Sequence, residues 1–153
     1  MQLRRAGLLH DVGKVAVASQ ILSNPSGLTD EEFAEIQKHP LVGAMMLAHA
    51  GLPEEAEWVR HHHERADGRG YPDGLSLDEI PFEARILLVA DAFEAMTSDR
   101  PYSPGMEVDA AIEELRRCAG TQFDPSVVEV FENLVAEDRI AVLALRRTPS
   151  ELL

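Results

Sequence analysis

The sequence lacks most of the features that mark secreted, membrane-spanning or nucleic-acid-binding proteins. Its single cysteine, Cys118, excludes an internal disulfide and any cluster of thiolate metal ligands, as is typical of a protein in a reducing compartment. No apolar run approaches the roughly 18 residues of a membrane span. The apolar stretch behind Arg4 and Arg5 is too short for the core of a signal peptide. We therefore expect a cytoplasmic protein.

Positive charge is also scarce. The chain has 14 Lys and Arg residues against 27 Asp and Glu residues, a formal net charge of −13, which disfavours general attraction to DNA or RNA. An acidic chain can still surround a cation site, since a bound metal ion is the largest charge in its surroundings. With 153 residues, of which 45% are hydrophobic, the chain can bury the core of one domain. We expect that domain over residues 1–147, followed by a tail at 148–153.

The spacing of the apolar residues predicts an all-α fold, because no alternation is long enough for a sheet. Thr29, with Glu32 three residues later, predicts an N-cap, and Pro40 predicts that one helix ends at His39 and the next begins. We expect helices over residues 3–13, where Gly13 stops the chain, and over 29–39, 40–51, 53–64, 82–100, 107–120 and 125–139. Residues 66–81, rich in glycine and proline, predict a functional loop.

His10 and Asp11 stand side by side in LLHDVGK, with Lys14 one turn later. Neighbouring side chains on a helix point about 100° apart, so these two could reach two metal ions, with the carboxylate bridging them. Lys14 lies on the same side if the turn persists. The alternative is a helix that ends in polar residues at a glycine. The motif alone does not choose between the two.

Three consecutive histidines, His61 to His63, precede the glycine-proline turn. Consecutive side chains splay around a helix axis, so at most two can point into one site, and the third should be exposed. His39, taken alone, favours a solvated N-cap over a ligand. His49 favours a structural or surface role.

Asp91 lies in RILLVADAFEAM, which has almost no polar side on which a carboxylate could be solvated. A buried acid must be paired or metal-bound, and the surplus of histidines favours ligation over a salt bridge. A set of imidazole and carboxylate donors suits iron, manganese or zinc. Two ions about 3.5–4 Å apart have the geometry used for phosphoester hydrolysis. Lys14 and Arg100 are the candidate cations for the substrate phosphate.

HDVGK, followed by HHERADGRGYP, resembles the HD-GYP family of metal-dependent phosphodiesterases of bacterial cyclic di-GMP signalling. The similarity runs from about residue 6 to about residue 131 and includes HPLVGA, DGLSLDEIPFEARILLVADAFEAMTSDRPY and GTQFDP in the family's order. It implies an HD-domain-like helical bundle over residues 1–147. It also implies hydrolysis of cyclic di-GMP to linear pGpG, to GMP or to both by a metal-activated water.

The resemblance further implies a role for each matched residue. The implied metal ligands are His10, Asp11, His39, His62, His63 and Asp91, with Asp11 bridging the ions. The implied catalytic residues are Asp11 and Lys14, and the implied substrate-binding residues are Lys14, Gly70, Tyr71, Pro72 and Arg100. The implied cofactors are two divalent ions, iron or manganese before zinc, magnesium or nickel, with no third ion. The expected partners are a signalling domain of the diguanylate-cyclase or receiver type, or a second copy of the chain docked on an apolar groove that the absence of the family's first helices would expose.

Three features depart from the family pattern. Only nine residues precede His10, whereas family members carry upstream helices with a further ligand histidine. We therefore expect either a fragment or a metal with fewer ligands, for which His49, His61 or a partner chain could substitute. The residues after RPY are serine and proline instead of a cation, and Ala66 replaces a common aromatic. These departures leave a second hypothesis, a catalytically weak module that binds nucleotide or a partner signalling domain.

Overall fold

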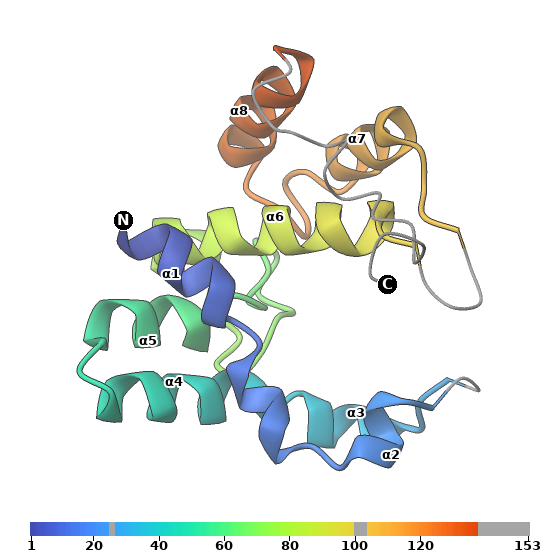
Figure 1. Ribbon diagram of the computed structural model, residues 1–153. Helices are drawn as coiled ribbons and strands as arrows, with labels where there is room; N and C mark the ends of the chain where they lie inside the picture. Colours follow the sequence, from blue (N-terminus) through green and yellow to red (C-terminus); the bar gives the residue numbers. More distant parts are fainter. Residues whose placement is uncertain (25–26, 100–103, 138–153) are drawn as a thin grey trace, which may run out of the picture. The chain divides into compact units, whose positions relative to one another are not determined.

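The computed structural model describes residues 1–24, 27–99 and 104–137, and in these ranges the chain forms helices and no strands (Figure 1). The α-helices are α1 (Gln2–Leu9), α2 (Ser19–Leu22), α3 (Asp30–Ile36), α4 (His39–His49), α5 (Pro53–Arg60), α6 (Phe82–Thr97), α7 (Val108–Arg117) and α8 (Pro125–Ala136), and the 3-10 helices are η1 (Val12–Ala16) and η2 (Leu77–Glu79). The all-α prediction is confirmed. In the part of the chain so described, no helix combines the length and the apolarity that a membrane span requires.

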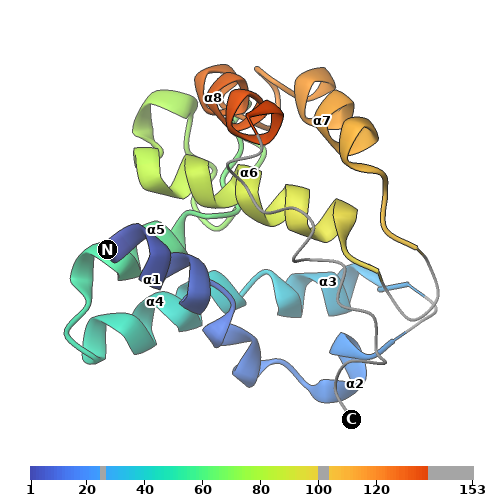
Figure 2. The same ribbon diagram turned by 45° about the horizontal axis from the view of Figure 1, so that its top comes forward.

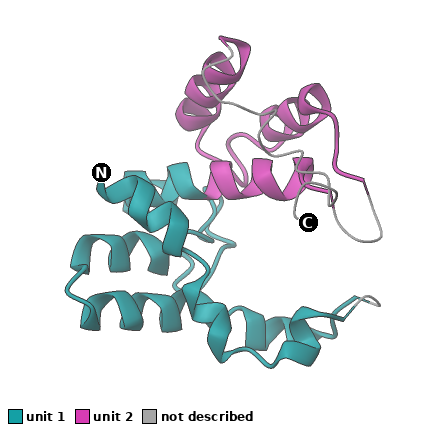
Figure 3. Cartoon of the chain, in the orientation of Figure 1, with its two compact units in different colours: residues 1–87 teal, residues 88–153 magenta. Residues whose placement is uncertain are grey.

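The chain divides into two compact units, residues 1–87 and residues 88–153 (Figure 3). The boundary falls within α6, so the first turns of this helix belong to the first unit and the later turns to the second. The predicted division between residues 147 and 148 lies outside the described residues and stays a prediction.

Two helix ends differ from the sequence-based expectation. The first helix ends at Leu9, and Gly13 lies inside η1, where the chain tightens to approach α4. The prediction that a helix ends at His39 is wrong, because α3 ends at Ile36 and His39 begins α4. Pro40 falls in the first turn of α4, where no N–H is needed, so it does not separate His39 from that helix. The four-residue helix α2 was not expected, since one turn carries no periodicity.

Two predicted helix starts are confirmed. The side chain of Thr29 accepts a hydrogen bond from the Glu32 amide at 3.2 Å, and the Glu32 carboxylate accepts one from the Thr29 amide at 2.9 Å. Pro53 occupies the first turn of α5, as expected. A helix N-terminus leaves its first backbone amides without partners. The Thr29 capping box satisfies two of these amides, and Pro53 has no amide hydrogen that would need a partner.

Helices α1, α4 and α5 form the core of the first unit. Figures 1 and 2 show α4 and α5 side by side, joined by a tight turn at Gly51, whose φ of +76° is the left-handed conformation that favours glycine. Their apolar faces meet α1 in a buried cluster made of Ala6, Leu47, Ala56, Val59 and Leu87.

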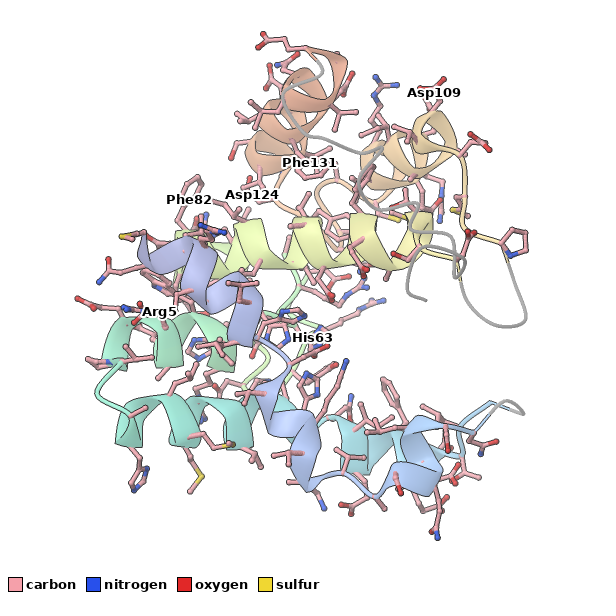
Figure 4. The ribbon with its side chains drawn as sticks, in the orientation of Figure 1. Arg5, His63, Phe82, Asp109, Asp124 and Phe131 are labelled. Carbon is pink, nitrogen blue, oxygen red and sulfur yellow. The ribbon has the colours of Figure 1, made fainter. Side chains whose placement is uncertain are left out.

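A buried acid links α1 to α5. Glu55 is fully buried, and its Oε1 accepts hydrogen bonds from both Nε, at 2.8 Å, and Nη2 of Arg5, which is labelled in Figure 4. Burial raises the pKa of Glu55, but the hydrogen bond and the charge of Arg5 lower it by more, so the pKa lies below its ordinary value of 4.5. The ion pair therefore keeps Glu55 ionised in the core.

In the second unit, α7 and α8 bury one apolar face each. Ala111, Ile112 and Leu115 are buried on α7, and Phe131 of α8 meets the ring of Phe93 edge to face at 5.0 Å between centroids. The Asp124 side chain caps α8 by accepting a hydrogen bond from the Ser126 amide at 2.9 Å.

Replacing Arg5 by Met should leave the Glu55 carboxylate buried without its cation and lower the melting temperature by roughly 5 °C or more. Replacing both residues by Met should restore most of the loss, because an apolar pair needs no compensating charge. The ionised pair stabilises the fold above the unfolded pKa, so the difference between wild type and Arg5→Met should shrink as the pH falls below 4.5. Gln2→Ala, which removes the exposed Gln2–Glu54 hydrogen bond, is the matched control and should change little. An Arg5→Met melting temperature equal to that of wild type would contradict this assignment.

Candidate metal centre

The predicted ligands of the first unit all stand at helix ends. His10 follows α1, and Asp11 precedes η1. His39 begins α4, and His62 and His63 follow the last turn of α5. Since α1, η1, α4 and α5 pack together, these ends meet in one place.

Three of the imidazoles are oriented in the same way. The Nδ1 atoms of His10, His39 and His62 lie 2.7, 2.7 and 2.6 Å from the backbone carbonyl oxygens of the residues three positions earlier, Gly7, Ile36 and Val59. A carbonyl oxygen only accepts, so each Nδ1 carries the hydrogen and donates it. The lone pair of each ring is then on Nε2, the tautomer that coordination through Nε2 requires.

The surroundings of the His39 Nε2 atom show whether a metal ion fits this site. This atom is buried and, among the described residues, has no hydrogen-bond partner. Burial lowers the pKa of His39, against the opposing effects of the Ile36 carbonyl and the Asp11 charge, so the ring stays neutral at neutral pH. A buried neutral imidazole with an unused lone pair is costly without a ligand and suitable for a divalent ion.

Asp11 lies between two of these rings. Its Oδ2 is 3.5 Å from Nε2 of His10, and its Oδ1 is 3.4 Å from Nε2 of His39. Lys14 donates a hydrogen bond to Oδ2 at 2.7 Å, which confirms that Lys14 and Asp11 share one side. One carboxylate oxygen thus faces each histidine, the arrangement of a bridging ligand.

The potential ligand atoms form two groups that share one histidine. The atoms of His10, Asp11 and His62 lie within 4.8 Å of one another, and so do those of His39, His62 and His63. The rings of His62 and His63 (the latter labelled in Figure 4) are 4.0 Å apart between centroids. These distances, the nitrogen and oxygen donors and the buried Nε2 of His39 fit divalent metal ions.

Two predicted residues, Asp91 and Arg100, are not among the described residues of the first unit. Asp91 is half-buried on α6, in the second unit, and α6 exposes Ala90 and Glu94, so the expectation of a helix with almost no polar side is wrong. Its role as a ligand stays a prediction. Arg100 lies outside the described residues, and its role as a phosphate-binding residue also stays a prediction.

The two surplus histidines belong to neither ligand group in the described ranges. The expectation that the third histidine is exposed is wrong for His61. Its Nε2 lies 3.1 Å from Oδ2 of Asp73, a carboxylate that also accepts hydrogen bonds from Arg60. His49 is exposed on α4, in agreement with the expected surface role, and its Nδ1 lies 2.8 Å from the Met45 carbonyl oxygen.

Residues 70–75 border the histidine groups, and we call them the substrate loop because they include the predicted substrate-binding residues Gly70, Tyr71 and Pro72. The ring of Tyr71 lies 4.9 Å from that of His63, at an angle of 31°, and 6.4 Å from the exposed ring of Phe33 on α3. Sequence reasoning missed Phe33, Glu64 and Asp73, which hold or line this loop. The only signal for Glu64 was its place directly after the histidines.

Comparison with known proteins identifies the family of the chain. The sequence model of the HD domain family matches residues 1–127. Over 132 residues the chain is 44% identical to a cyclic di-GMP phosphodiesterase of Pseudomonas aeruginosa, covering 85% of this chain and 32% of that protein. It is 38% identical over 124 residues to the 3'3'-cGAMP-specific phosphodiesterase 3 of Vibrio cholerae, covering 80% of this chain and 27% of that protein. The resemblance to the HD-GYP family is thus confirmed.

A solved structure shares the fold. The crystal structure of a cyclic GMP-AMP-specific phosphodiesterase of V. cholerae matches with a TM-score of 0.71 and 21% identity, over 96% of this chain and 40% of that chain. The chain spans about a third of the length of the P. aeruginosa relative, 32%. The similarity therefore concerns one domain of longer proteins.

Asp11→Asn keeps the size of the side chain but removes the charge that would bridge two ions. It should lower metal affinity by about 100-fold or more, because Asp11 belongs to one ligand group and its Oδ1 lies 3.4 Å from Nε2 of His39 in the other. Metal analysis of the protein after dialysis against a weak chelator measures this loss. Lys14→Met, which removes the neighbouring cation, is the matched control and should retain metal. Equal metal content in wild type and Asp11→Asn would show that Asp11 is not a ligand.

Gly13→Ala should disrupt the metal centre by steric overlap. A Cβ at this position would lie 2.0 Å from the carbonyl oxygen of His39 and 2.6 Å from the amide nitrogen of Gly43. We expect a loss of about 1–3 kcal/mol or more in the free energy of unfolding, together with weaker metal binding. Gly7→Ala is the control, since its nearest contact would be an ordinary 3.6 Å to Leu87, and it should stabilise α1 by up to about 1 kcal/mol. A Gly13→Ala variant that behaves like Gly7→Ala would refute this packing argument.

Proposed function

The chain belongs to the HD domain family, and we propose that it is a metal-dependent phosphodiesterase that hydrolyses cyclic dinucleotides, with cyclic di-GMP as its substrate. One observation carries the proposal: the carboxylate of Asp11 lies between His10 and His39, with one oxygen toward each Nε2 at 3.5 and 3.4 Å. A bridging carboxylate between imidazoles is the arrangement that a two-ion phosphodiesterase needs. The names of the relatives, which include cyclic di-GMP and 3'3'-cGAMP phosphodiesterases, support the substrate class.

Two divalent ions, when bound, supply an activated water and neutralise the phosphoryl oxygens. We propose His10, Asp11, His39, His62, His63 and Asp91 as their ligands. Oxygen and nitrogen donors without thiolate suit iron or manganese, and zinc, magnesium or nickel are the alternatives.

Residues of the chain itself position the substrate and the attacking water. The ammonium of Lys14 donates to Asp11 at 2.7 Å, and its two remaining hydrogens can reach a water or a phosphate oxygen beside the carboxylate. Tyr71 holds a flat ring next to His63 and offers a dinucleotide a stacking surface, while Gly70 lets the loop pack closely against residues 63–65. Arg100 completes the proposed substrate-binding set with Gly70, Tyr71 and Pro72.

The products, pGpG, GMP or both, follow from the number of phosphodiester bonds that are cut before release. A second copy of the chain and a receiver-type or diguanylate-cyclase domain remain the proposed partners. The catalytically weak module is the competing function, and metal content together with turnover separates the two.

The test is a chromatographic assay of cyclic di-GMP cleavage by the chain purified anaerobically and loaded with manganese or iron, with metal counted on the same sample. We expect pGpG or GMP to form at about two ions per chain. 3'3'-cGAMP and a linear dinucleotide serve as competing substrates, and Asp11→Asn is the inactive control. A metal-loaded protein that binds cyclic di-GMP without cleaving it would establish the binding module instead.

A further inference from the structure

One buried carboxylate joins the ligand histidines to the substrate loop. Glu64 follows His63 directly and is 1% exposed. Its Oε1 accepts hydrogen bonds from the amides of Asp73, at 2.7 Å, and Gly74, at 3.0 Å, and its Oε2 accepts one from Leu75 at 3.0 Å. Three consecutive amides thus converge on a single side chain. Charge-assisted bonds of this kind are stronger than bonds between neutral groups, and a buried carboxylate cannot be left without them.

The substrate loop is pressed against the same segment at its other end. The amide of Tyr71 donates to the His63 carbonyl oxygen at 3.2 Å. A Cβ at Gly70 would lie 2.4 Å from the amide nitrogen of Arg65, 2.5 Å from Cα of Glu64 and 2.6 Å from the carbonyl oxygen of His63. There is no space between the two stretches of chain at this point, so a shift of one moves the other.

An exposed ion pair adds a third contact. Arg60 donates two hydrogen bonds to Asp73, from Nε and from Nη2, both at 2.8 Å. Arg60 and Asp73 are partly exposed to solvent, which weakens the pair, whereas Glu64 is shielded. Glu64 is therefore the strongest single link between the ligand segment and the loop.

Glu64 belongs to neither group of potential metal ligands in the described ranges. The three amides from which Glu64 accepts hydrogen bonds belong to the residues that follow Pro72. The ring of Tyr71, just before them, lies 4.9 Å from that of His63. We propose that Glu64 is a positioning residue that fixes Tyr71 and Gly70 beside the ligand His63, and that it thereby sets the affinity for the cyclic dinucleotide and not the affinity for metal. This inference rests on the proposed function, because the position of the loop affects KM only if the substrate contacts the loop.

The test compares Glu64→Ala, Glu64→Gln and Glu57→Ala. The first variant removes all three hydrogen bonds. Glutamine keeps one carbonyl oxygen, which can still accept from Asp73 and Gly74, but turns its own N–H groups toward the Leu75 amide. Glu57, an exposed acid on α5, supplies the charge-matched control. For each protein we would measure metal content, kcat and KM for cyclic di-GMP, and the rate of tryptic cleavage after the exposed Arg69.

We expect KM to rise about tenfold in Glu64→Ala, with kcat changed less than about twofold and metal content unchanged, the pattern of lost binding energy common to ground and transition states. Glu64→Gln should be intermediate, and Glu57→Ala should equal wild type. Trypsin should cut Glu64→Ala after Arg69 about tenfold faster, because opening of the loop needs less free energy. If Glu64→Ala fails to fold, Glu64→Gln carries the same comparison.

Two results would overturn the inference. A wild-type KM together with wild-type cleavage after Arg69 would show that Glu64 does not hold the loop. A loss of metal in proportion to the loss of activity would make Glu64 a support of the metal centre instead of the loop. Failure of the proposed function gives a different result, because a metal-loaded wild type that cleaves no cyclic dinucleotide refutes that function. Faster proteolysis of Glu64→Ala would still show that Glu64 holds the substrate loop.

Discussion

A hydrogen bond from Nδ1 of a histidine to a backbone carbonyl three residues earlier is the interaction on which the site depends. It occurs at His10, His39 and His62, each at a helix end, with distances of 2.6–2.7 Å. Each bond fixes both the tautomer and the direction of the ring, so the Nε2 lone pairs are oriented by the backbone. One oxygen of the Asp11 carboxylate faces Nε2 of His10 and the other faces Nε2 of His39.

The packing of glycines brings these helix ends together. Gly13 leaves space for the His39 carbonyl, and Gly43 lies against Val59 and Val12, so η1, α4 and α5 approach closely. The Arg5–Glu55 pair holds α1 against α5. Glu64 is a second buried acid that accepts several hydrogen bonds, in this case from three amides of the substrate loop. The fold thus uses polar groups in its interior to fix the chain segments that carry the chemistry.

The sequence predicts the helices better than their ends. The periodicity and the Thr29 capping box suffice for most helices, but the end of the first helix at Leu9 depends on how Gly13 packs, which is a tertiary contact. The family resemblance predicts the HD pair and the histidine run as ligands, whereas spacing alone favours a solvated cap for His39. His39 is 1% exposed, and its burial depends on the tertiary packing of η1 and α5 against α4. The environments of His61 and Glu64 could not be predicted either, since both follow from the way residues 70–75 fold back.

The central claim is the proposal that two ions are bridged by the carboxylate of Asp11, and anomalous diffraction from crystals of the manganese- or iron-loaded chain tests it most directly. The account predicts two anomalous peaks separated by about 3.5–4 Å. It further predicts coordination by Nε2 of His10, His39 and His62, with the Nδ1–carbonyl bonds intact. A single peak, or coordination through Nδ1, would contradict the account, because the orientation of the rings would then not define the site.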